Sequence, residues 1–522
     1  HYHCELESLN SDVLSRLQEE NIYVVQDGSF LAVAALQEYQ VVKAARRLSL
    51  AAKWKSVKQL SEENIYSQLT SNNKDSFFVE KGCIPSATAK IPDLEQIDGD
   101  ENKTIRATYR KPYHMHASIG PSAGCASYDG DALIVWTHNQ GVYPLRAAIT
   151  EAFDMATDNV TVQFVPGSGV YGHNGADDAA FDAAIIARHI RGHPILLKWT
   201  RDDEHSWEPY GSAMQCEIQA SIDKNGKISS WSHETFADTF LARPITGKQP
   251  ATRMVSAHYI EDALPWPIAE PMMVPHGGIH RNMEMLYEMP EPRLVKNRVY
   301  DLPLRTSALR TLGAYGNVFA NESMINELAE SANIDPFNFR LNHLKDERAI
   351  AVLVKLQQVM EDNSRDEEQF GYGIGFARYK NSAAYCAIGV CLSVNEAAEV
   401  KLHDAYIVCD AGEIVDAEGV RAQLEGGFIQ AASWTLYEQV LYERDGIVSR
   451  DWDTYPIITF DNIPQMHTHL IVNPGMPYLG AGEGAAGPTA AAIGNALKDA
   501  TGLRVREMPF NPDRIMAAAL EE

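Results

Sequence analysis

The sequence lacks the features that mark several large classes of protein. Its 45 Lys and Arg stand against 70 Asp and Glu, and the net charge of −25 argues against binding to nucleic acid or to anionic membrane surfaces. Its apolar runs fall short of the roughly 18 residues that a membrane-spanning helix needs. The first residues, His1 to Glu7, have neither the basic start nor the apolar region of a signal peptide. We therefore expect a soluble protein, of either the cytoplasm or the periplasm.

The seven cysteines are too scattered for a disulfide framework. They run from Cys4 to Cys409 without a C-x-x-C pair. This spacing is typical of reduced, mostly buried thiols, and it argues against an iron–sulfur cluster on this chain because a cluster needs clustered thiolates. The sequence also contains no nucleophile elbow, P-loop or H-E-x-x-H motif.

The length, composition and local patterns of the chain predict an α+β protein of several domains. A chain of 522 residues with 45% apolar and 22% charged residues should form roughly two to four domains, each with its own core. Residues 59–103 and 361–368 are polar and are interpreted as irregular connecting segments. The predicted domains are therefore 1–103, which includes the first connecting segment, 104–360 and 369–522.

Local patterns predict many of the helices and strands. Asp27-Gly28 has hairpin turn chemistry, and Asp177 and Asp178 precede a helix that they are predicted to cap. Residues 241–300 show weak periodicity and are left unassigned. The predicted strands are 22–26, 30–34, 132–136, 160–165, 194–199 and an antiparallel set within 212–240. The predicted helices are 38–50, 143–155, 177–190 and 489–501, with an amphipathic helix after Gly313 and another after Asp335-Pro336.

One carboxylate stands alone in a glycine-rich stretch near the end of the chain. Gly480-Ala-Gly-Glu-Gly-Ala-Ala-Gly-Pro488 holds Glu483 among residues without any other polar side chain. Its glycines allow sharp turns and a close approach to a bound group, and Pro488 suits the first turn of a helix. Glu483 is thus expected beside backbone N–H groups that favour anions, where it could act as a general base. A solvated glutamate in a surface loop is an equally good interpretation of this stretch alone.

A second glycine-rich stretch matches the G-x-G-x-x-G pattern of a dinucleotide-binding fingerprint but not its structural context. Gly167-Ser-Gly-Val-Tyr-Gly172 follows a predicted strand, but four residues separate it from the next helix. The acidic residue at the end of the next strand, Asp202, is 30 positions beyond Gly172, whereas about 20 are expected. NAD binding is therefore not expected, and contact with another large anionic cofactor stays open.

Several polar residues have both structural and functional interpretations. Gln140 follows a buried strand, where its amide could satisfy nearby backbone groups or a ligand. Arg310 lies between apolar residues, where an ion pair at the edge of the core and recognition of a planar anion are both common. Three histidines show no metal-ligand spacing and are interpreted as structural: His116, His173 and His205.

Taken in order, six stretches resemble the molybdenum-binding large subunit of the xanthine dehydrogenase and aldehyde oxidase family. The stronger likeness is to its nicotinate dehydrogenase and isoquinoline oxidoreductase branch, from about residue 20 to the end. It implies a partial hammerhead-like α/β domain followed by two molybdopterin-binding α+β domains. The stretches are Trp136–Gly141, Gly169–Asp178, Trp199–His205, Pro303–Arg310, Gly426–Trp434 and Gly480–Pro488.

The resemblance also implies roles for individual residues. Glu483 matches the glutamate that serves as the catalytic base, and Gln140 matches the glutamine that hydrogen-bonds the cofactor's apical oxygen. Leu312 falls where some relatives place an aromatic residue that stacks on the substrate. The cofactor-binding residues that it implies are Gln140, Tyr171, Gly172, Arg310, Gly482 and Gly484.

The same resemblance implies cofactors and partners. It implies molybdopterin, for which the cytosine dinucleotide form is one option, and a small partner subunit that carries a [2Fe–2S] cluster. A cytochrome c or flavoprotein subunit is a further partner that it allows. The family's G-Q-G cofactor loop does not occur in this sequence, so we expect a fragment or half of a split subunit, whose missing segment comes from elsewhere.

The function expected on this basis is that of a molybdenum hydroxylase acting on an N-heteroaromatic compound such as nicotinate. An aldehyde is the nearer alternative substrate. A cofactor-free scaffold or assembly protein is the alternative from another class, and the missing G-Q-G loop favours it. Arg305 and Arg310, if they line the pocket, would favour a substrate with a carboxylate.

Overall fold

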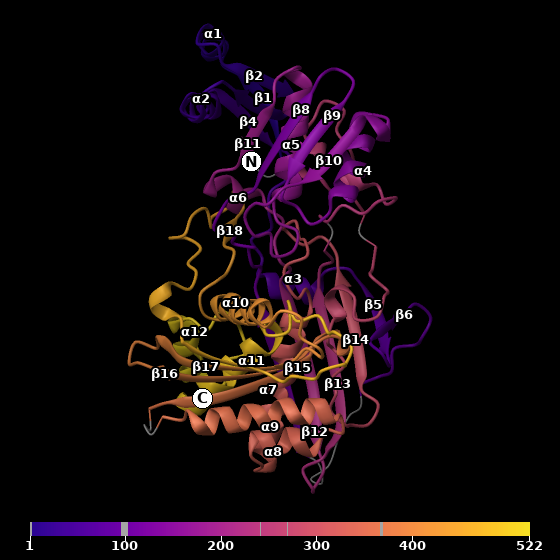
Figure 1. The fold of residues 1–522 in the computed structure, drawn as a ribbon, viewed down its shortest axis with the longest axis vertical. Helices are drawn as coiled ribbons and strands as arrows, with labels where there is room; N and C mark the ends of the chain where they lie inside the picture. The colour runs from indigo at the N-terminus through magenta and orange to yellow at the C-terminus, as the bar shows by residue number, and fades with distance from the viewer. Residues whose placement is uncertain (1–2, 95–102, 241, 269, 366–368, 522) are drawn as a thin grey trace.

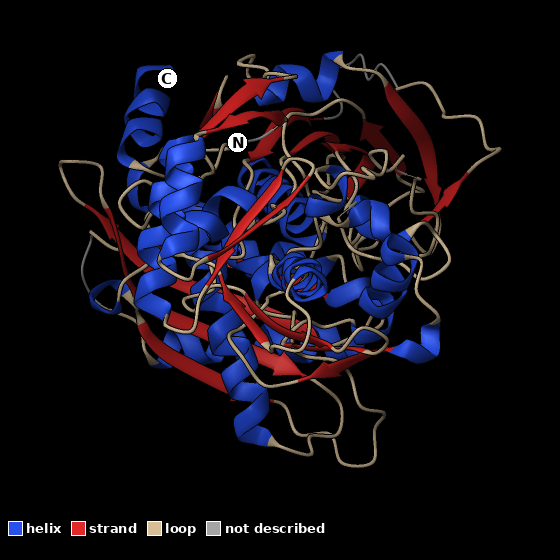
Figure 2. Ribbon diagram, turned by 90° about the horizontal axis from the view of Figure 1, so that it is seen from above, coloured by secondary structure: helices blue, strands red, loops and turns tan. Residues whose placement is uncertain are grey.

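The protein has an elongated shape with two lobes (Figure 1). The computed structural model describes residues 3–94, 103–240, 242–268, 270–365 and 369–521. One lobe contains the N-terminal elements and a four-stranded sheet, and the other contains a six-stranded sheet, a second four-stranded sheet and the C-terminus. Viewed along the long axis, many of the strands lie towards the periphery and helices fill much of the centre (Figure 2).

The N-terminal elements form two small sheets. The predicted hairpin and the helix after it are confirmed, and the hairpin turns at Gly28, whose φ is +57°. The elements are β1 (Cys4–Leu9), which pairs antiparallel with β4 (Ala52–Ser56), the hairpin of β2 (Tyr23–Asp27) and β3 (Phe30–Ala34), and the helices α1 (Ser11–Glu19) and α2 (Glu38–Ala51).

The four-stranded sheet of the same lobe has the order β10-β9-β8-β11. Strands β9 and β10 are parallel, with Leu133 opposite Val160, and α5 packs against β8 through its small residues. All five predicted elements in this region are confirmed to within two residues, namely β9 (Leu133–Thr137), α4 (Val142–Phe153), β10 (Val160–Phe164), α5 (Ala176–His189) and β11 (Ile195–Lys198). The structure adds β8 (Ala123–Tyr128) and α6 (Arg201–Trp207), which the sequence analysis did not predict.

The six-stranded sheet corrects one interpretation of the sequence. Residues 59–103 are not an irregular connecting segment, because they contain α3 (Ile65–Ser71) and two strands of this sheet. Their polar character reflects an edge position rather than irregular backbone. Residues 95–102 lie outside the described part of the chain. In sheet order the strands are β6 (Ile84–Ser86), β5 (Lys74–Glu80), β14 (Arg293–Val299), β13 (Ile228–Ala237), β12 (Met214–Ile222) and β7 (Lys103–Lys111).

The third large sheet carries helices on both faces. Gly373 and Gly375 of β15 lie against the backbone of α11, while Gly389 of β16 lies against Met360 of α9 on the other face. Glycine lets each helix approach the strands closely. In sheet order the strands are β15 (Gly371–Arg378), β16 (Tyr385–Val394), β17 (Val400–Asp410) and β20 (Gln465–Leu470), and the helices are α9 (Glu347–Asp362) and α11 (Ala486–Thr501).

The remaining helices connect these layers. The helix predicted after Gly313 is α7, which is buried on nearly all sides rather than on one apolar face, because two sheets and α11 surround it. Residues 361 and 362 belong to α9 rather than to a linker, and 366–368 lie outside the described residues. These elements are α7 (Ala314–Ala332), α8 (Pro336–Asn342), α10 (Ala417–Leu436), β18 (Tyr442–Glu443), β19 (Gly446–Ile447) and α12 (Pro512–Glu521).

Across the described ranges, the structure contains no helix with the length and apolar character needed to cross a membrane.

Candidate active site

Glu483 lies on the loop that leads into α11, and its carboxylate is held rather than free in solvent. The side chain is partly buried, and its Oε1 accepts a hydrogen bond from the backbone N–H of Thr311 at 2.7 Å. The helix runs from Ala486 to Thr501, and Gly502 follows it in a left-handed conformation. The position therefore differs from that of a solvated glutamate in a surface loop.

The turn that contacts Glu483 has a strained backbone. Thr311 has φ +75° and Leu312 has φ +51°, and the N–H of Leu312 donates to the carbonyl of Leu309 at 2.8 Å. A β-branched residue with positive φ is a genuine outlier that costs about 1–3 kcal/mol. The strain accompanies an orientation in which the N–H of Thr311 points at the carboxylate. The side chain of Leu312 packs partly against a small apolar cluster.

Arg310 ties the Glu483 loop to α10. Its Nε donates to the carbonyl of Gly482 at 2.9 Å, and its Nη2 donates to the carbonyl of Gln423 at 2.9 Å. A third contact joins Nη1 to Oε1 of Gln430 at 3.3 Å. Burial lowers the pKa of Arg310, and the nearby charge of Glu483 opposes that effect. The guanidinium thus places a positive charge beside Glu483 while being held by neutral oxygens.

The loop of Tyr171 and Gly172 is hydrogen-bonded to the same segment. The N–H of Arg310 donates to the carbonyl of Tyr171 at 2.8 Å, and the N–H of His173 donates to that of Ala308 at 2.8 Å. Gly172 has φ +131°, and a Cβ on it would lie 1.8 Å from the carbonyl oxygen of Ala308. Only glycine fits this position. Three stretches far apart in the sequence therefore meet at residues 308–312.

Gln140 lies nearby, exposed just past the end of β9. The next residue, Gly141, faces the ring of His173: an added Cβ would lie 3.7 Å from its Cε1. The loop of Gln140 therefore adjoins the Tyr171–Gly172 loop. The structure thus brings Gln140, Tyr171, Gly172, Arg310, Leu312, Gly482, Glu483 and Gly484 into one region.

Buried carboxylates support this region. Nδ1 of His116 lies 2.9 Å from Oε2 of Glu208, and its Nε2 lies 3.1 Å from the carbonyl oxygen of Ala308. Nδ1 of His173 lies 2.9 Å from Oδ2 of Asp177, whose other oxygen accepts from the amide of Asn139. Both histidines thus hold backbone or loop geometry through carboxylates.

The prediction that Asp177 and Asp178 cap α5 is wrong. Gly175 occupies the N-cap, and both aspartates lie buried in the first turn. Asp177 contacts His173, while Asp178 forms a salt bridge with Arg305 at 2.7 Å. Their positions on the helix were visible in the sequence, but their partners come from other segments. A buried carboxylate needs a charged or hydrogen-bonding partner, and such a partner outweighs a capping role.

Sequence reasoning missed Tyr379. Its hydroxyl is buried just past the end of β15 and accepts a hydrogen bond from Nη1 of Arg281 at 2.5 Å. Burial, and then the charge and hydrogen bond of Glu483, raise the pKa of Tyr379 well above its usual value. The only signal in the sequence is a tyrosine in a polar stretch, Arg378 to Asn381, directly after a strand.

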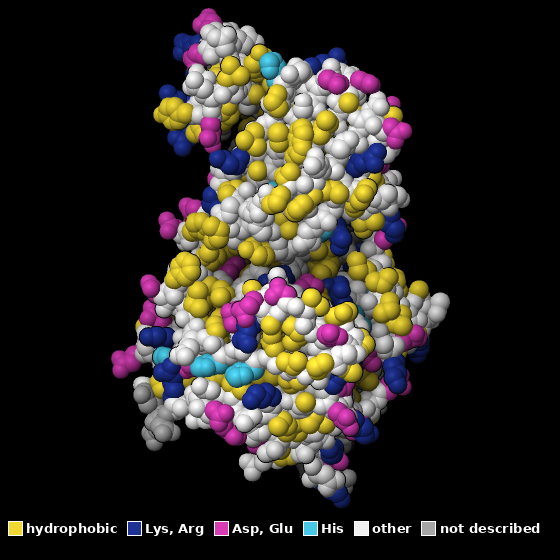
Figure 3. Space-filling view, in the orientation of Figure 1, with side chains coloured by type: hydrophobic (Ala, Val, Ile, Leu, Met, Phe, Trp, Pro, Cys, Tyr) yellow, Lys and Arg dark blue, Asp and Glu magenta, His cyan; other side chains and the backbone are white. Residues whose placement is uncertain are grey.

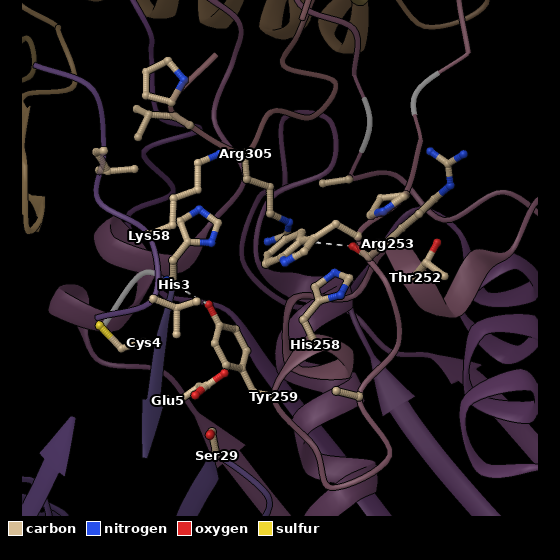
Figure 4. Close-up of a pocket in the computed structure, with 18 of the residues that line it drawn as sticks. His3, Cys4, Glu5, Ser29, Lys58, Thr252, Arg253, His258, Tyr259 and Arg305 are labelled. Atoms are coloured by element: carbon tan, nitrogen blue, oxygen red, sulfur yellow. Dashed lines mark hydrogen bonds between the residues drawn. The ribbon is translucent and has the colours of Figure 1, made fainter. Parts of the chain in front are cut away.

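A large cavity lies elsewhere. It has a volume of about 1000 Å³ and is lined by residues of β1, of the 252–267 segment and of 301–306, but by none of the Glu483 loop (Figure 4). Arg305 lines this cavity and is held there by Asp178, whereas Arg310 contacts the Glu483 loop. In the space-filling view the surface narrows between the lobes, where hydrophobic side chains gather (Figure 3).

Comparisons with known families identify molybdopterin cofactor-binding domains in this chain. Two family models, each described as a molybdopterin cofactor-binding domain, match residues 87–264 and 320–464. A nicotinate dehydrogenase subunit from Pseudomonas putida is 31% identical over 519 residues, covering 95% of this chain and 41% of that protein. The beta subunit of isoquinoline 1-oxidoreductase from Brevundimonas diminuta is 27% identical, covering 69% of this chain and 43% of that protein.

The chain thus spans less than half the length of these two curated relatives. Among solved structures, quinoline 2-oxidoreductase from Pseudomonas putida 86 superimposes with a TM-score of 0.77 at 12% identity, over 99% of this chain and 93% of that one. Carbon monoxide dehydrogenase from Oligotropha carboxidovorans gives a TM-score of 0.74 at 11% identity, over 100% of this chain and 93% of that one. At these identities the likeness establishes the fold.

Proposed function

Since the chain belongs to the molybdopterin-binding subunits of the xanthine dehydrogenase and aldehyde oxidase family, we propose that it provides the catalytic base of a molybdenum hydroxylase. The observation that carries this proposal is the setting of Glu483. A single carboxylate, held by the N–H of Thr311 and placed beside Arg310, lies at the meeting point of the stretches that resemble the family. A carboxylate that is fixed and partly buried suits general-base catalysis.

The residues around Glu483 fit an anionic cofactor. A Cβ added to Gly480 or Gly426 would meet no atom within 4 Å, so the backbone there is accessible to a bound group. The loop also leads into α11, and a helix N-terminus favours phosphate. Gln140, Tyr171, Gly172, Arg310, Gly482 and Gly484 would hold molybdopterin, which supplies two-electron redox chemistry when bound.

Within this proposal each side chain has a limited task. Glu483 takes the proton lost by the water-derived oxygen that enters the substrate. The N–H of Thr311 keeps the carboxylate oriented, and the guanidinium of Arg310 balances its charge. The electrons leave for a partner subunit with a [2Fe–2S] cluster. A cytochrome c or flavoprotein subunit would be the next acceptor.

We propose an N-heteroaromatic substrate, with nicotinate as the first candidate. The names of the two relatives above, a nicotinate dehydrogenase and an isoquinoline oxidoreductase, support this class. An aldehyde is the second candidate, because the molybdenum-binding subunit of an aldehyde oxidoreductase from Escherichia coli is 26% identical over 269 residues. Leu312 offers a less specific wall than an aromatic residue would.

The test is Glu483→Gln in the full-length protein. It keeps the shape of the side chain and removes the base, so kcat should fall about 10²–10⁴-fold while molybdenum and pterin contents stay unchanged. Glu418→Gln is the matched control, because the side chain of Glu418 is 88% exposed on α10. Near-normal turnover in Glu483→Gln would contradict the proposal.

Two further measurements separate the alternatives. Stoichiometric molybdenum and pterin in the purified wild-type protein would exclude a cofactor-free scaffold, and their absence would favour one. A comparison of kcat/KM for nicotinate, isoquinoline and an aliphatic aldehyde would rank the substrate classes, and a preference for the aldehyde would reverse our order.

A further inference from the structure

Glu483 has a second neighbour besides the strained turn, and this neighbour follows a strand of the third large sheet. Tyr379 comes directly after β15, and its side chain is only 6% exposed. Its hydroxyl accepts a hydrogen bond from Nη1 of Arg281 at 2.5 Å and interacts with the nearby Glu483 carboxylate. A phenolic oxygen that accepts from a cation has its own proton left to donate to an anion.

We propose that Tyr379 is a positioning residue for Glu483. With the N–H of Thr311 it forms a two-point clamp, in which one donor comes from the 308–312 turn and the other from the loop after β15. Two donors from separate elements fix the place and the orientation of a carboxylate more firmly than one donor does. The inference rests on the proposed function, because it assigns Tyr379 a part in that reaction.

Arg281 holds the phenol in place. It is 9% exposed, and its Nε donates to the carbonyl of His276 at 2.9 Å, which fixes the guanidinium. The neighbouring Asn282 accepts from the N–H of Lys380 at 2.8 Å and donates to the carbonyl of Arg378 at 2.8 Å. The backbone on both sides of Tyr379 is therefore pinned to the segment that carries Arg281.

The loop of Tyr379 is also tied to the loop of Glu483. The N–H of Ala384 donates to the carbonyl of Gly480 at 3.2 Å, and the N–H of Tyr379 donates to the carbonyl of Ala384 at 3.1 Å. Lys380 and Asn381 have φ of +53° and +48°. Two consecutive non-glycine residues in this conformation indicate that the surrounding contacts dictate the loop.

The charges around the carboxylate have the sign that the clamp needs. Arg310 and Lys380 both interact electrostatically with Glu483, and Arg281 interacts with Tyr379. Positive charges beside a carboxylate attract it and help to hold it in place. The phenol stays neutral beside it, because burial and the adjacent anion both disfavour a phenolate.

The experiment uses Tyr379→Phe in the full-length protein, with Tyr385→Phe as the matched control. Tyr385 starts β16, and its hydroxyl donates to Asp346 at 2.9 Å instead of to Glu483. Loss of one hydrogen bond to a charged group should lower kcat of Tyr379→Phe about 10- to 100-fold, with KM within about twofold. Molybdenum content and the unfolding midpoint should match those of the control.

A readout without turnover tests the contact itself. The protein is labelled with 3-fluorotyrosine, and the ¹⁹F resonance of Tyr379 is assigned as the one that disappears in Tyr379→Phe. That resonance should move in Glu483→Gln and stay in place in Glu418→Gln.

The outcomes distinguish this inference from the proposed function. The inference fails and the proposed function stands under three joint results. Glu483→Gln is inactive, Tyr379→Phe keeps wild-type kcat, and the resonance of Tyr379 does not shift in Glu483→Gln. If Glu483→Gln keeps its turnover, both fail. A loss of kcat in Tyr379→Phe together with a shifted resonance in Glu483→Gln supports the clamp.

Discussion

Two carboxylates serve the same short segment, residues 308–312, in different ways. Glu483 contacts it directly through the N–H of Thr311 and is partly exposed. Glu208 contacts it through His116, and the side chains of both are fully buried. A carboxylate that must exchange protons needs access to its surroundings, whereas one that holds a histidine in place is more effective when water is excluded. Burial thus separates the proposed base from the structural carboxylate.

The largest effect on stability should come from Glu208→Ala. It would leave His116 buried without its partner, and breaking a buried pair costs about 3–5 kcal/mol. Urea unfolding followed by circular dichroism measures the loss. Glu483→Ala is the comparison, and it should lower stability by much less. Equal losses for the two variants would show that burial does not separate their roles.

The next effect concerns the bridge between the loops. Gly172→Ala would place a Cβ 1.8 Å from the carbonyl oxygen of Ala308, at a φ of +131°. We expect a loss of about 1–3 kcal/mol, together with a loss of activity as the Arg310–Tyr171 bond opens. Gly192→Ala is the control, because Gly192 also has positive φ, at +78°, but an added Cβ there meets no atom within 4 Å. A full-activity Gly172→Ala enzyme would contradict the bridge.

The smallest effect is a pH dependence of stability that comes from a buried carboxyl group, that of Glu438. Burial raises the pKa of Glu438 to about 8 from its usual 4.5. The folded protein therefore keeps a proton that the unfolded chain loses, so the stability contributed by the neutral carboxyl is present below pH 4.5 and is lost as pH rises towards 8. Glu438→Gln has no such proton to lose.

Between pH 6 and pH 7, the stability of Glu438→Gln relative to wild type should rise by about 1.4 kcal/mol. Urea unfolding at the two pH values measures this change. The exposed Glu443→Gln serves as the control substitution. A stability difference between Glu438→Gln and wild type that does not change with pH would contradict the raised pKa of Glu438.

The sequence by itself determined what depends on neighbouring residues. The hairpin at Asp27-Gly28 follows from turn chemistry. The order of strands and helices from β9 to β11 follows from periodicity, and the end of α11 just before Gly502 follows from capping. The glycine-rich setting of Glu483 was visible in the same way, since it lies within nine consecutive residues.

Only the tertiary structure decided which distant residues meet. Residues 59–103 contribute strands because β14, more than 200 positions later, pairs with β5. Asp178 leaves its capping role because Arg305 reaches it, and Thr311 adopts positive φ where its N–H meets Glu483. Local preferences amount to about 1 kcal/mol per residue, and buried charge pairs and packed strands outweigh them. The partners of the candidate base therefore had to be found in space rather than along the chain.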